Sequence, residues 1–347
     1  MKQDNYRTWV AVTFALSLCV IALGAYTRLT EAGLGCPDWP GCYGFAGVPK
    51  GDAQQALAAS RFPDAPLEAD KAWNEMLHRY VAGTLGLMIL ALNILAWRKP
   101  TRPKALPFML LATVIFQALL GMWTVTMDLM PVVVMGHLLG GFTTASLLFL
   151  LWLRLDSRAV LPQVEIPHRG LQVFAVFGLL VVIGQIGLGG WTAANYAAVV
   201  CTQLPLCEVD WRQGFDTSAF ALIQPEHETY QYGVLDYQQR VTIHVTHRIG
   251  AMVTAMTLTA LAFLLWRLRA LRVVATVMLL VLAGQIGLGI TNIVASLPLS
   301  VAVAHNVTGV LLLLSLVAVN LQVYRMRLQG ACPGQVAAGQ GMDKHVA

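Results

Sequence analysis

The stretch LQVFAVFGLLVVIGQIGLGGWTAA (residues 171–194) runs for 24 residues without a charged side chain. A bilayer core about 30 Å thick needs roughly 20 apolar residues for each spanning helix, so this stretch predicts a membrane-spanning helix. Seven further segments meet the same criterion. They are residues 8–26, 76–97, 106–127, 132–153, 241–266, 273–296 and 299–324.

The composition supports this interpretation. Hydrophobic residues make up 57% of the chain and charged residues only 12%, whereas soluble proteins carry about 25% charged residues. Segment 8–26 is kept as a helix because no small-residue signal cleavage site follows it. The sequence therefore predicts an all-α integral membrane protein with eight transmembrane helices.

Basic residues predict its orientation, because cytoplasmic loops carry an excess of Lys and Arg. Long outer loops, rich in Asp and Glu, are then expected at residues 28–74 and 195–239, with both termini in the cytoplasm. The basic residues are scattered along the inner membrane face, so nucleic-acid binding is set aside. They are Lys2, Arg7, Arg98, Lys99, Arg102, Lys104, Arg154, Arg158, Arg267, Arg269, Arg272, Arg325 and Arg327.

The chain also repeats itself. Cysteine pairs recur at an offset of 165 residues, the His-Arg pair at 169, and a Gln and a second His at 168. The first set is Cys36, Cys42, His78, Arg79, Gln117 and His137, and the second is Cys201, Cys207, His247, Arg248, Gln285 and His305. Each copy holds four spans, so the copies enter the membrane in the same direction as parallel repeats. We expect two four-helix bundles, residues 1–155 and 170–327, with a cytoplasmic linker (156–169) and a disordered cytoplasmic tail (328–347).

The four repeated histidines lie a few residues inside the outer ends of their spans, within roughly 10 Å of that surface at 1.5 Å per residue. Ionisable residues inside a membrane are costly and point to function. Two facing histidines in a four-helix bundle suit the axial positions of a haem iron. The alternatives are histidines that bond polar groups across helices, or zinc and copper sites, for which each half lacks further ligands.

The arginines Arg28, Arg79 and Arg248 stand near the outer interface. Guanidinium groups bind carboxylates in a bidentate fork, so these residues are candidates for contacts with haem propionates. Snorkelling of boundary arginines to the headgroups is the alternative.

The copies differ three residues before the first histidine, where Glu75 stands before His78 and His244 before His247. An i, i+3 pair shares one helix face. A carboxylate beside a haem pocket can accept protons or stabilise positive charge, which favours the first half as the reactive one. The alternative is that Glu75 is an interfacial residue at the start of the span.

The loop cysteines are expected to form the disulfides Cys36–Cys42 and Cys201–Cys207, since outer loops are oxidising. Cys19 and Cys332 fall within a span and the cytoplasmic tail, where thiols stay reduced. Whether Cys36–Cys42 is structural or passes electrons to the site below is left open.

Five motifs resemble haem A synthase, a family of membrane enzymes, over about residues 9–325. They are YTRLTEAGLGCPDWPGCYG (26–44), EMLHR (75–79), GHLLGG (136–141), THRIGA (246–251) and AHNVTG (304–309).

This resemblance implies oxidation of the C8 methyl of haem O to a formyl group, giving haem A for cytochrome oxidase in a bacterial inner membrane. It implies that His247 and His305 ligate a haem b cofactor, that His78 and His137 face haem O, and that Glu75 is the catalytic carboxylate. Expected partners are haem O, membrane lipid, haem O synthase and an electron carrier, and a homo-oligomer is compatible with the sequence.

Three other functions remain compatible with the residues alone. A diheme b-type cytochrome would take electrons from quinol, a transporter would move haem or a small solute on the same repeat, and a disulfide-handling protein would use the cysteine pairs as its active centre.

Overall fold

The computed structural model describes residues 3–156, 166–205 and 207–331. The regular secondary structure in these ranges consists of helices, with no β-strand, which confirms the all-α prediction. The α-helices are α1 (Gln3–Leu29), α2 (Gly51–Arg61), α3 (Ala69–Trp97), α4 (Ala105–Thr126), α5 (Pro131–Arg154), α6 (Arg169–Ala194), α7 (Tyr237–Trp266), α8 (Arg272–Val294) and α9 (Leu299–Ala331). Two short 3-10 helices, η1 (Thr217–Phe220) and η2 (Arg269–Leu271), flank α7.

Every one of these α-helices except α2 is long and apolar enough to cross a membrane, and together they match the eight predicted spans. The protein is therefore a multi-pass membrane protein. Helix α2, in the first outer loop, was not predicted. Helix α3 starts at Ala69, seven residues before the predicted start at residue 76. Most of the predicted linker (156–169) and tail (328–347) lies outside the described residues, although α9 continues to Ala331.

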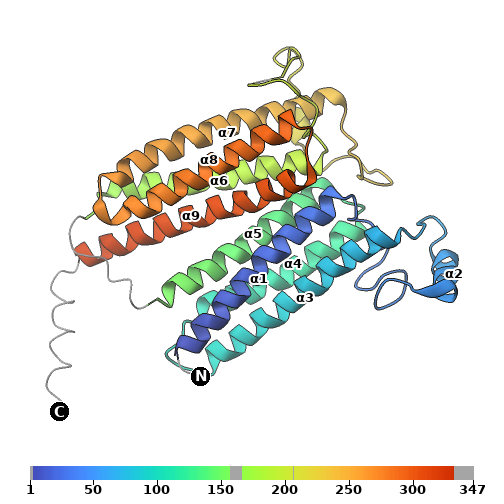
Figure 1. The fold of residues 1–347 in the computed structure, drawn as a ribbon, viewed down its shortest axis with the longest axis horizontal. Coiled ribbons are helices and arrows are strands. Elements are labelled where there is room, and N and C mark those ends of the chain that lie inside the picture. The colour runs from blue at the N-terminus through green and yellow to red at the C-terminus, as the bar shows by residue number, and fades with distance from the viewer. Residues whose placement is uncertain (1–2, 157–165, 206, 332–347) are drawn as a thin grey trace.

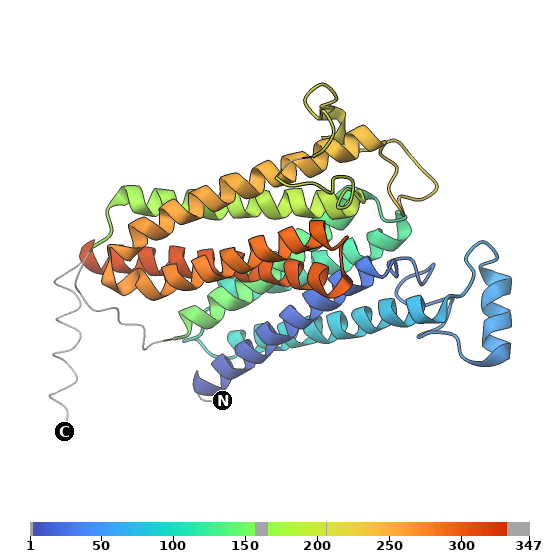
Figure 2. The ribbon, with the colours of Figure 1, turned by 45° about the horizontal axis from the view of Figure 1, so that its top comes forward.

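The long helices form two groups (Figure 1), with α1, α3, α4 and α5 in one and α6, α7, α8 and α9 in the other. We call these groups the first and second bundle. They meet where α1 and α5 pack against α6 and α9. Figures 1 and 2 show α2 and the loop before α7 at one end of the molecule, and the start of α1 and the end of α9 at the other.

Helix ends in the two bundles share one geometry. Glu31 and Tyr196, which follow α1 and α6 and are 165 residues apart, have φ angles of 57° and 53°. The turn after α4 places Asp128 and Leu129 at positive φ, and the turn after α8 does the same with Ser296 and Leu297, 168 residues later. These matched ends support the parallel repeat, which stays a prediction.

Helices dominate because the bilayer core offers no water to backbone N–H and C=O groups, so these groups must pair within the segment. Local signals mark the starts. Pro131 occupies the first turn of α5, where its missing N–H costs nothing. Asp236 and Gln239 form a reciprocal capping box at the start of α7, at 2.8 and 3.1 Å.

Close packing inside the second bundle depends on a glycine in α6. A Cβ added at Gly178 would lie 3.2 Å from Leu261 Cδ2 and 3.4 Å from Leu258 Cδ2, whereas one added at Gly184, on the same helix, would meet nothing within 4 Å. Gly178 therefore lets α6 approach α7 closely.

We predict that Gly178→Leu lowers the free energy of unfolding by about 1–3 kcal/mol, because its side chain overpacks a buried contact. Thermal unfolding in detergent, followed by circular dichroism, measures this. Gly184→Leu is the matched control and should leave the midpoint unchanged or slightly raised. Equal midpoints for the two variants would contradict the packing role of Gly178.

Candidate functional site

The four repeated histidines lie on α3, α5, α7 and α9, and each bundle supplies two of them. In the first bundle the rings of His78 and His137 face each other, with centroids 6.4 Å apart and planes at 85°. Metal ions bind imidazole nitrogens at about 2.0–2.1 Å, so rings at this separation leave room for one metal atom between them.

Each histidine ring lies against a glycine on a neighbouring spanning helix. A Cβ added at any of these glycines would come within 3.0–3.3 Å of the ring, so a larger residue there would displace the imidazole slightly. The pairs are Gly24 with His78, Gly121 with His137, Gly189 with His247 and Gly289 with His305. None of these glycines was among the predicted site residues. Their offsets, 165 from Gly24 to Gly189 and 168 from Gly121 to Gly289, match those of the repeat and could have indicated a shared role.

Glutamine amides accompany three of the histidines. Gln117 Nε2 donates to the backbone O of His137 at 2.8 Å. Gln185 Nε2 lies 3.0 Å from the backbone O of His247 and 3.1 Å from its Nδ1. Gln285 Nε2 lies 3.3 Å from Nε2 of His305.

Two ring nitrogens, Nδ1 of His137 and Nδ1 of His305, are buried without a hydrogen-bond partner among the described residues. Buried polar atoms are normally satisfied, so an orphaned one suggests a missing partner. The described residues contain no group of three His, Cys, Asp or Glu placed to hold a metal ion. Paired imidazoles with buried, unpartnered nitrogens fit a haem iron with two axial ligands.

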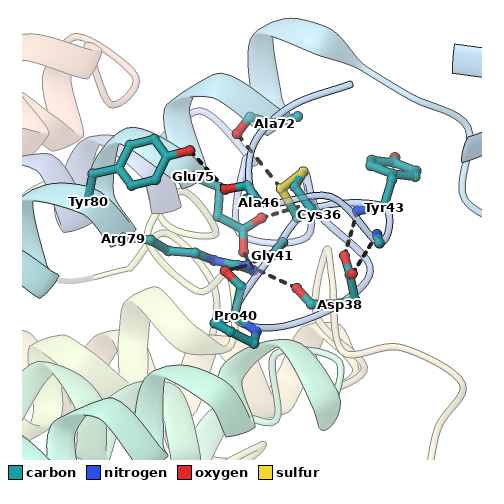
Figure 3. The surroundings of a disulfide bond; sticks show 12 residues. Cys36, Asp38, Pro40, Gly41, Tyr43, Ala46, Ala72, Glu75, Arg79 and Tyr80 are labelled. Atoms are coloured by element: carbon teal, nitrogen blue, oxygen red, sulfur yellow. Dashed lines mark hydrogen bonds and ion pairs between the residues drawn. A yellow bond between two sulfur atoms is a disulfide. The ribbon is translucent and has the colours of Figure 1, made fainter. Parts of the chain in front are cut away.

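Glu75 is held by the loop between α1 and α3 (Figure 3). The residue is buried, with 5% of its surface exposed. Its Oε2 accepts a hydrogen bond from the backbone N–H of Cys36 at 2.9 Å, and its Oε1 pairs with Arg79. Both oxygens are therefore held in place above His78 on the same helix.

Arg79 ties this carboxylate to the disulfide loop. Its Nη1 donates to the carbonyl oxygens of Asp38 at 2.9 Å, Pro40 at 3.3 Å and Gly41. The carboxylate of Asp38 in turn accepts from the backbone N–H groups of Tyr43 and Gly44, at 2.6 and 2.7 Å. The loop around the disulfide is thus fixed from both sides.

The second bundle has the same arginine contact without the carboxylate. Arg248 donates to the carbonyl oxygens of Cys201 and Gln203, both at 2.6 Å. His244, at the position of Glu75, has its Nδ1 2.6 Å from the carbonyl oxygen of Ala197. A carbonyl only accepts, so that nitrogen carries a proton, and His244 links α7 to the residues after α6.

Both predicted disulfides are present. Cys36 pairs with Cys42 and Cys201 with Cys207, with Cα–Cα distances of 4.8 and 5.0 Å. Cys19 is a free cysteine on α1, and Cys332 lies outside the described residues.

Arg28 joins the two bundles. It donates to the hydroxyl of Tyr196 at 2.7 Å and to the carbonyl oxygen of Ala193 at 2.9 Å, and its guanidinium lies 4.1 Å from the centre of the Tyr196 ring. A cation at a helix C-terminus is favourable, so Arg28 of α1 stabilises the end of α6. Propionate contacts of Arg28, Arg79 and Arg248 stay a prediction, and each arginine already binds backbone carbonyls.

Two groups in the outer loops have shifted pKa values. Burial, with smaller contributions from the carboxylates of Glu68, Glu75 and Asp38, raises the pKa of Tyr43, whose hydroxyl donates to the carbonyl of Pro66 at 3.1 Å. Backbone N–H groups, its own first and then those of Thr202 and Gln203, lower the pKa of Glu208 to about 2. At neutral pH Tyr43 is therefore a hydrogen-bond donor and Glu208 an anion.

Comparison with known proteins identifies the family. Residues 7–317 match the sequence model of the COX15-CtaA family, described as cytochrome oxidase assembly protein. The chain belongs to the COX15-CtaA family. This agrees with the resemblance inferred from the motifs.

Several relatives within this family carry the name Heme A synthase. The protein of Shewanella oneidensis is 49% identical over 90% of this chain and 95% of its own length. Those of Methylobacterium radiotolerans and Sphingopyxis alaskensis are 30% and 28% identical, over 90% and 88% of this chain and 88% of their own lengths.

We predict that Arg79→Gln speeds reduction of Cys36–Cys42 by a water-soluble phosphine, because the loop loses its carbonyl contacts and opens more often. Mass tagging of the freed thiols measures the rate. Cys201–Cys207 in the same variant is the internal control, and Arg248→Gln should reverse the pattern. Equal rates for both disulfides in each variant would refute the anchoring role of the arginines.

Proposed function

We propose that this chain oxidises the C8 methyl of haem O to a formyl group and so makes haem A. The observation that carries the proposal is the buried Glu75 carboxylate, fixed one helical turn from His78, whose ring faces His137. The family and the names of its members support the same activity. The family and these names favour haem A synthesis over the functions of a diheme cytochrome, a haem transporter or a disulfide-handling protein.

Substrate haem O would lie in the first bundle, between His78 and His137. A haem b cofactor would be held in the second bundle by His247 and His305. When bound there, haem b supplies reversible one-electron transfer. The facing rings of His78 and His137 and the unpartnered Nδ1 atoms of His137 and His305 support these assignments.

The overall change converts a methyl group to an aldehyde in two hydroxylations followed by loss of water. Each hydroxylation with water as the oxygen source removes two electrons and two protons. The resulting gem-diol loses one water molecule to leave the formyl group. The four electrons require an acceptor, which we propose to be a membrane electron carrier reached through the second bundle.

Glu75 meets two needs of this chemistry. An anion close to the methyl stabilises positive charge that develops as electrons leave, and a carboxylate can accept the released protons. Arg79 and the N–H of Cys36 hold the carboxylate in position. His244, at the matching position of the second bundle, supplies no negative charge, which supports a reactive first bundle and an electron-transferring second one.

The cellular setting is also proposed. The named relatives come from bacteria, which favours a bacterial inner membrane, and basic residues at the helix ends favour cytoplasmic termini. Because haem O is poorly soluble in water, direct transfer from haem O synthase is a reasonable route to the site.

We predict that Glu75→Gln keeps haem binding but lowers haem A formation by about 100-fold or more, since general acid–base groups contribute roughly 10²–10⁴-fold. Haem O or its hydroxylated form should accumulate, as measured by chromatography of haems extracted from cells that co-express haem O synthase.

Glu68→Gln is the matched control. Glu68 precedes α3 on the same side of the molecule, where it pairs with Lys71 at 2.9 Å. It should leave the haem A yield unchanged. An unchanged yield in Glu75→Gln would remove Glu75 from the mechanism.

A further inference from the structure

One glutamine-glycine pattern occurs three times beside a histidine and is altered at the fourth. Gln117 and Gly121 flank His137, Gln285 and Gly289 flank His305, and Gln185 and Gly189 flank His247. In each case the glutamine precedes the glycine by four residues, so both lie on one helix face. Beside His78 the glycine remains as Gly24, but the position of the glutamine holds Val20.

The amide of Gln185 contacts His247 at two points. Its Nε2 donates to the His247 backbone O at 3.0 Å and lies 3.1 Å from the ring Nδ1. Its Oε1 is buried without a hydrogen-bond partner among the described residues, which makes it an available acceptor for an Nδ1–H. No hydrogen bond to the ring of His78 is found within the described part of the chain.

A second residue changes together with this glutamine. A Cβ added at Gly250, on α7, would lie 2.3 Å from Gln185 Oε1, so the amide in this orientation occupies the space that a side chain there would take. The residue 169 positions earlier, which matches Gly250 in the first bundle, is Val81. The second bundle therefore has Gln185 with Gly250, and the first has Val20 with Val81.

Hydrogen bonds to the ring of a metal-ligating histidine fix its tautomer and orientation, and losing such a partner typically weakens metal binding about 10–100-fold. A cofactor has to be retained through many turnovers, whereas a substrate haem has to enter and its product has to leave. The two bundles therefore need opposite properties at these positions.

We propose that Gln185 is a positioning residue that makes the haem of the second bundle a retained cofactor, and that Val20 leaves His78 free to exchange its haem. The proposal rests on the proposed function for which bundle holds the cofactor. It adds a physical reason why two similar histidine pairs hold their haems for different times.

The first test measures how tightly the second bundle holds its haem. Protein expressed without haem O is purified and mixed with excess apomyoglobin, and haem loss is followed by absorbance. Gln185→Val should lose haem about 10–100-fold faster than the unmodified protein and should shift the electron paramagnetic resonance signal of its low-spin haem. Gln172→Val is the matched control. Gln172 lies near the opposite end of the same helix, where its side chain accepts a hydrogen bond from Arg327 at 2.7 Å and does not contact His247. This control variant should retain haem normally.

The double variant Gln185→Val/Gly250→Val separates positioning from packing. It places the valine pair of the first bundle in the second and refills the space that the amide leaves. If Gln185 only fills space, this variant should hold haem like the unmodified protein. Our proposal expects rapid haem loss to persist.

The reciprocal variant Val20→Gln/Val81→Gly tests the first bundle. When this variant is loaded with haem O, the rate of haem release to apomyoglobin should be about one tenth of that of the unmodified protein, or lower. Normal haem retention in Gln185→Val, recovery in the valine double variant, or unchanged release in the reciprocal variant would overturn the proposal. Failure of the unmodified protein to make haem A would instead overturn the proposed function, and the retention measurements do not depend on turnover.

Discussion

The bilayer core lacks water, and this constraint shapes the interior of the protein. A ring as polar as imidazole is stable there only if neighbouring helices supply both space and partners. Glycines beside all four rings supply the space, and glutamine amides contact the rings of His247 and His305 and the backbone oxygen of His137. A larger residue at Gly24 or Gly189 would displace the ring beside it, so the helices are packed closely around the polar groups that they enclose.

The disulfide loops are also held by polar side chains that find hydrogen-bond partners. Arg79 follows His78 and Arg248 follows His247. Each arginine donates to backbone carbonyl groups of the disulfide loop in its own half of the chain. The loops also connect the bundles, since Tyr230 donates its N–H to the carbonyl of Asp128 at 2.9 Å and Arg28 binds the end of α6. These contacts join the two bundles at this end of the molecule, while Glu75 itself is held by Cys36 and Arg79 of the first half.

Hydropathy and charge were enough to predict the eight spans, because apolar length alone decides which segments cross a bilayer. The histidines and both disulfides also followed from sequence, because they repeat at fixed offsets. Helix α2 was missed because its composition, GDAQQALAASR, carries no spanning signal. The partners of Arg28 were missed for another reason. Its contacts with Ala193 and Tyr196 depend on how α1 packs against α6, and no local pattern encodes that arrangement.

The two bundles differ most around one histidine of each pair. At the His137 and His305 positions, the glutamine and the glycine beside the ring are the same in both copies. At the His78 and His247 positions, three residues around the ring differ, with Glu75, Val20 and Val81 matched by His244, Gln185 and Gly250. In the first bundle, the carboxylate of Glu75 and the missing glutamine amide both lie next to His78. Under the proposed function, the reactive group and the weakened haem ligand are therefore on the same side of the site. We infer that one ligand position in each bundle stayed constant to bind haem, while the other diverged to decide whether that haem is kept or converted.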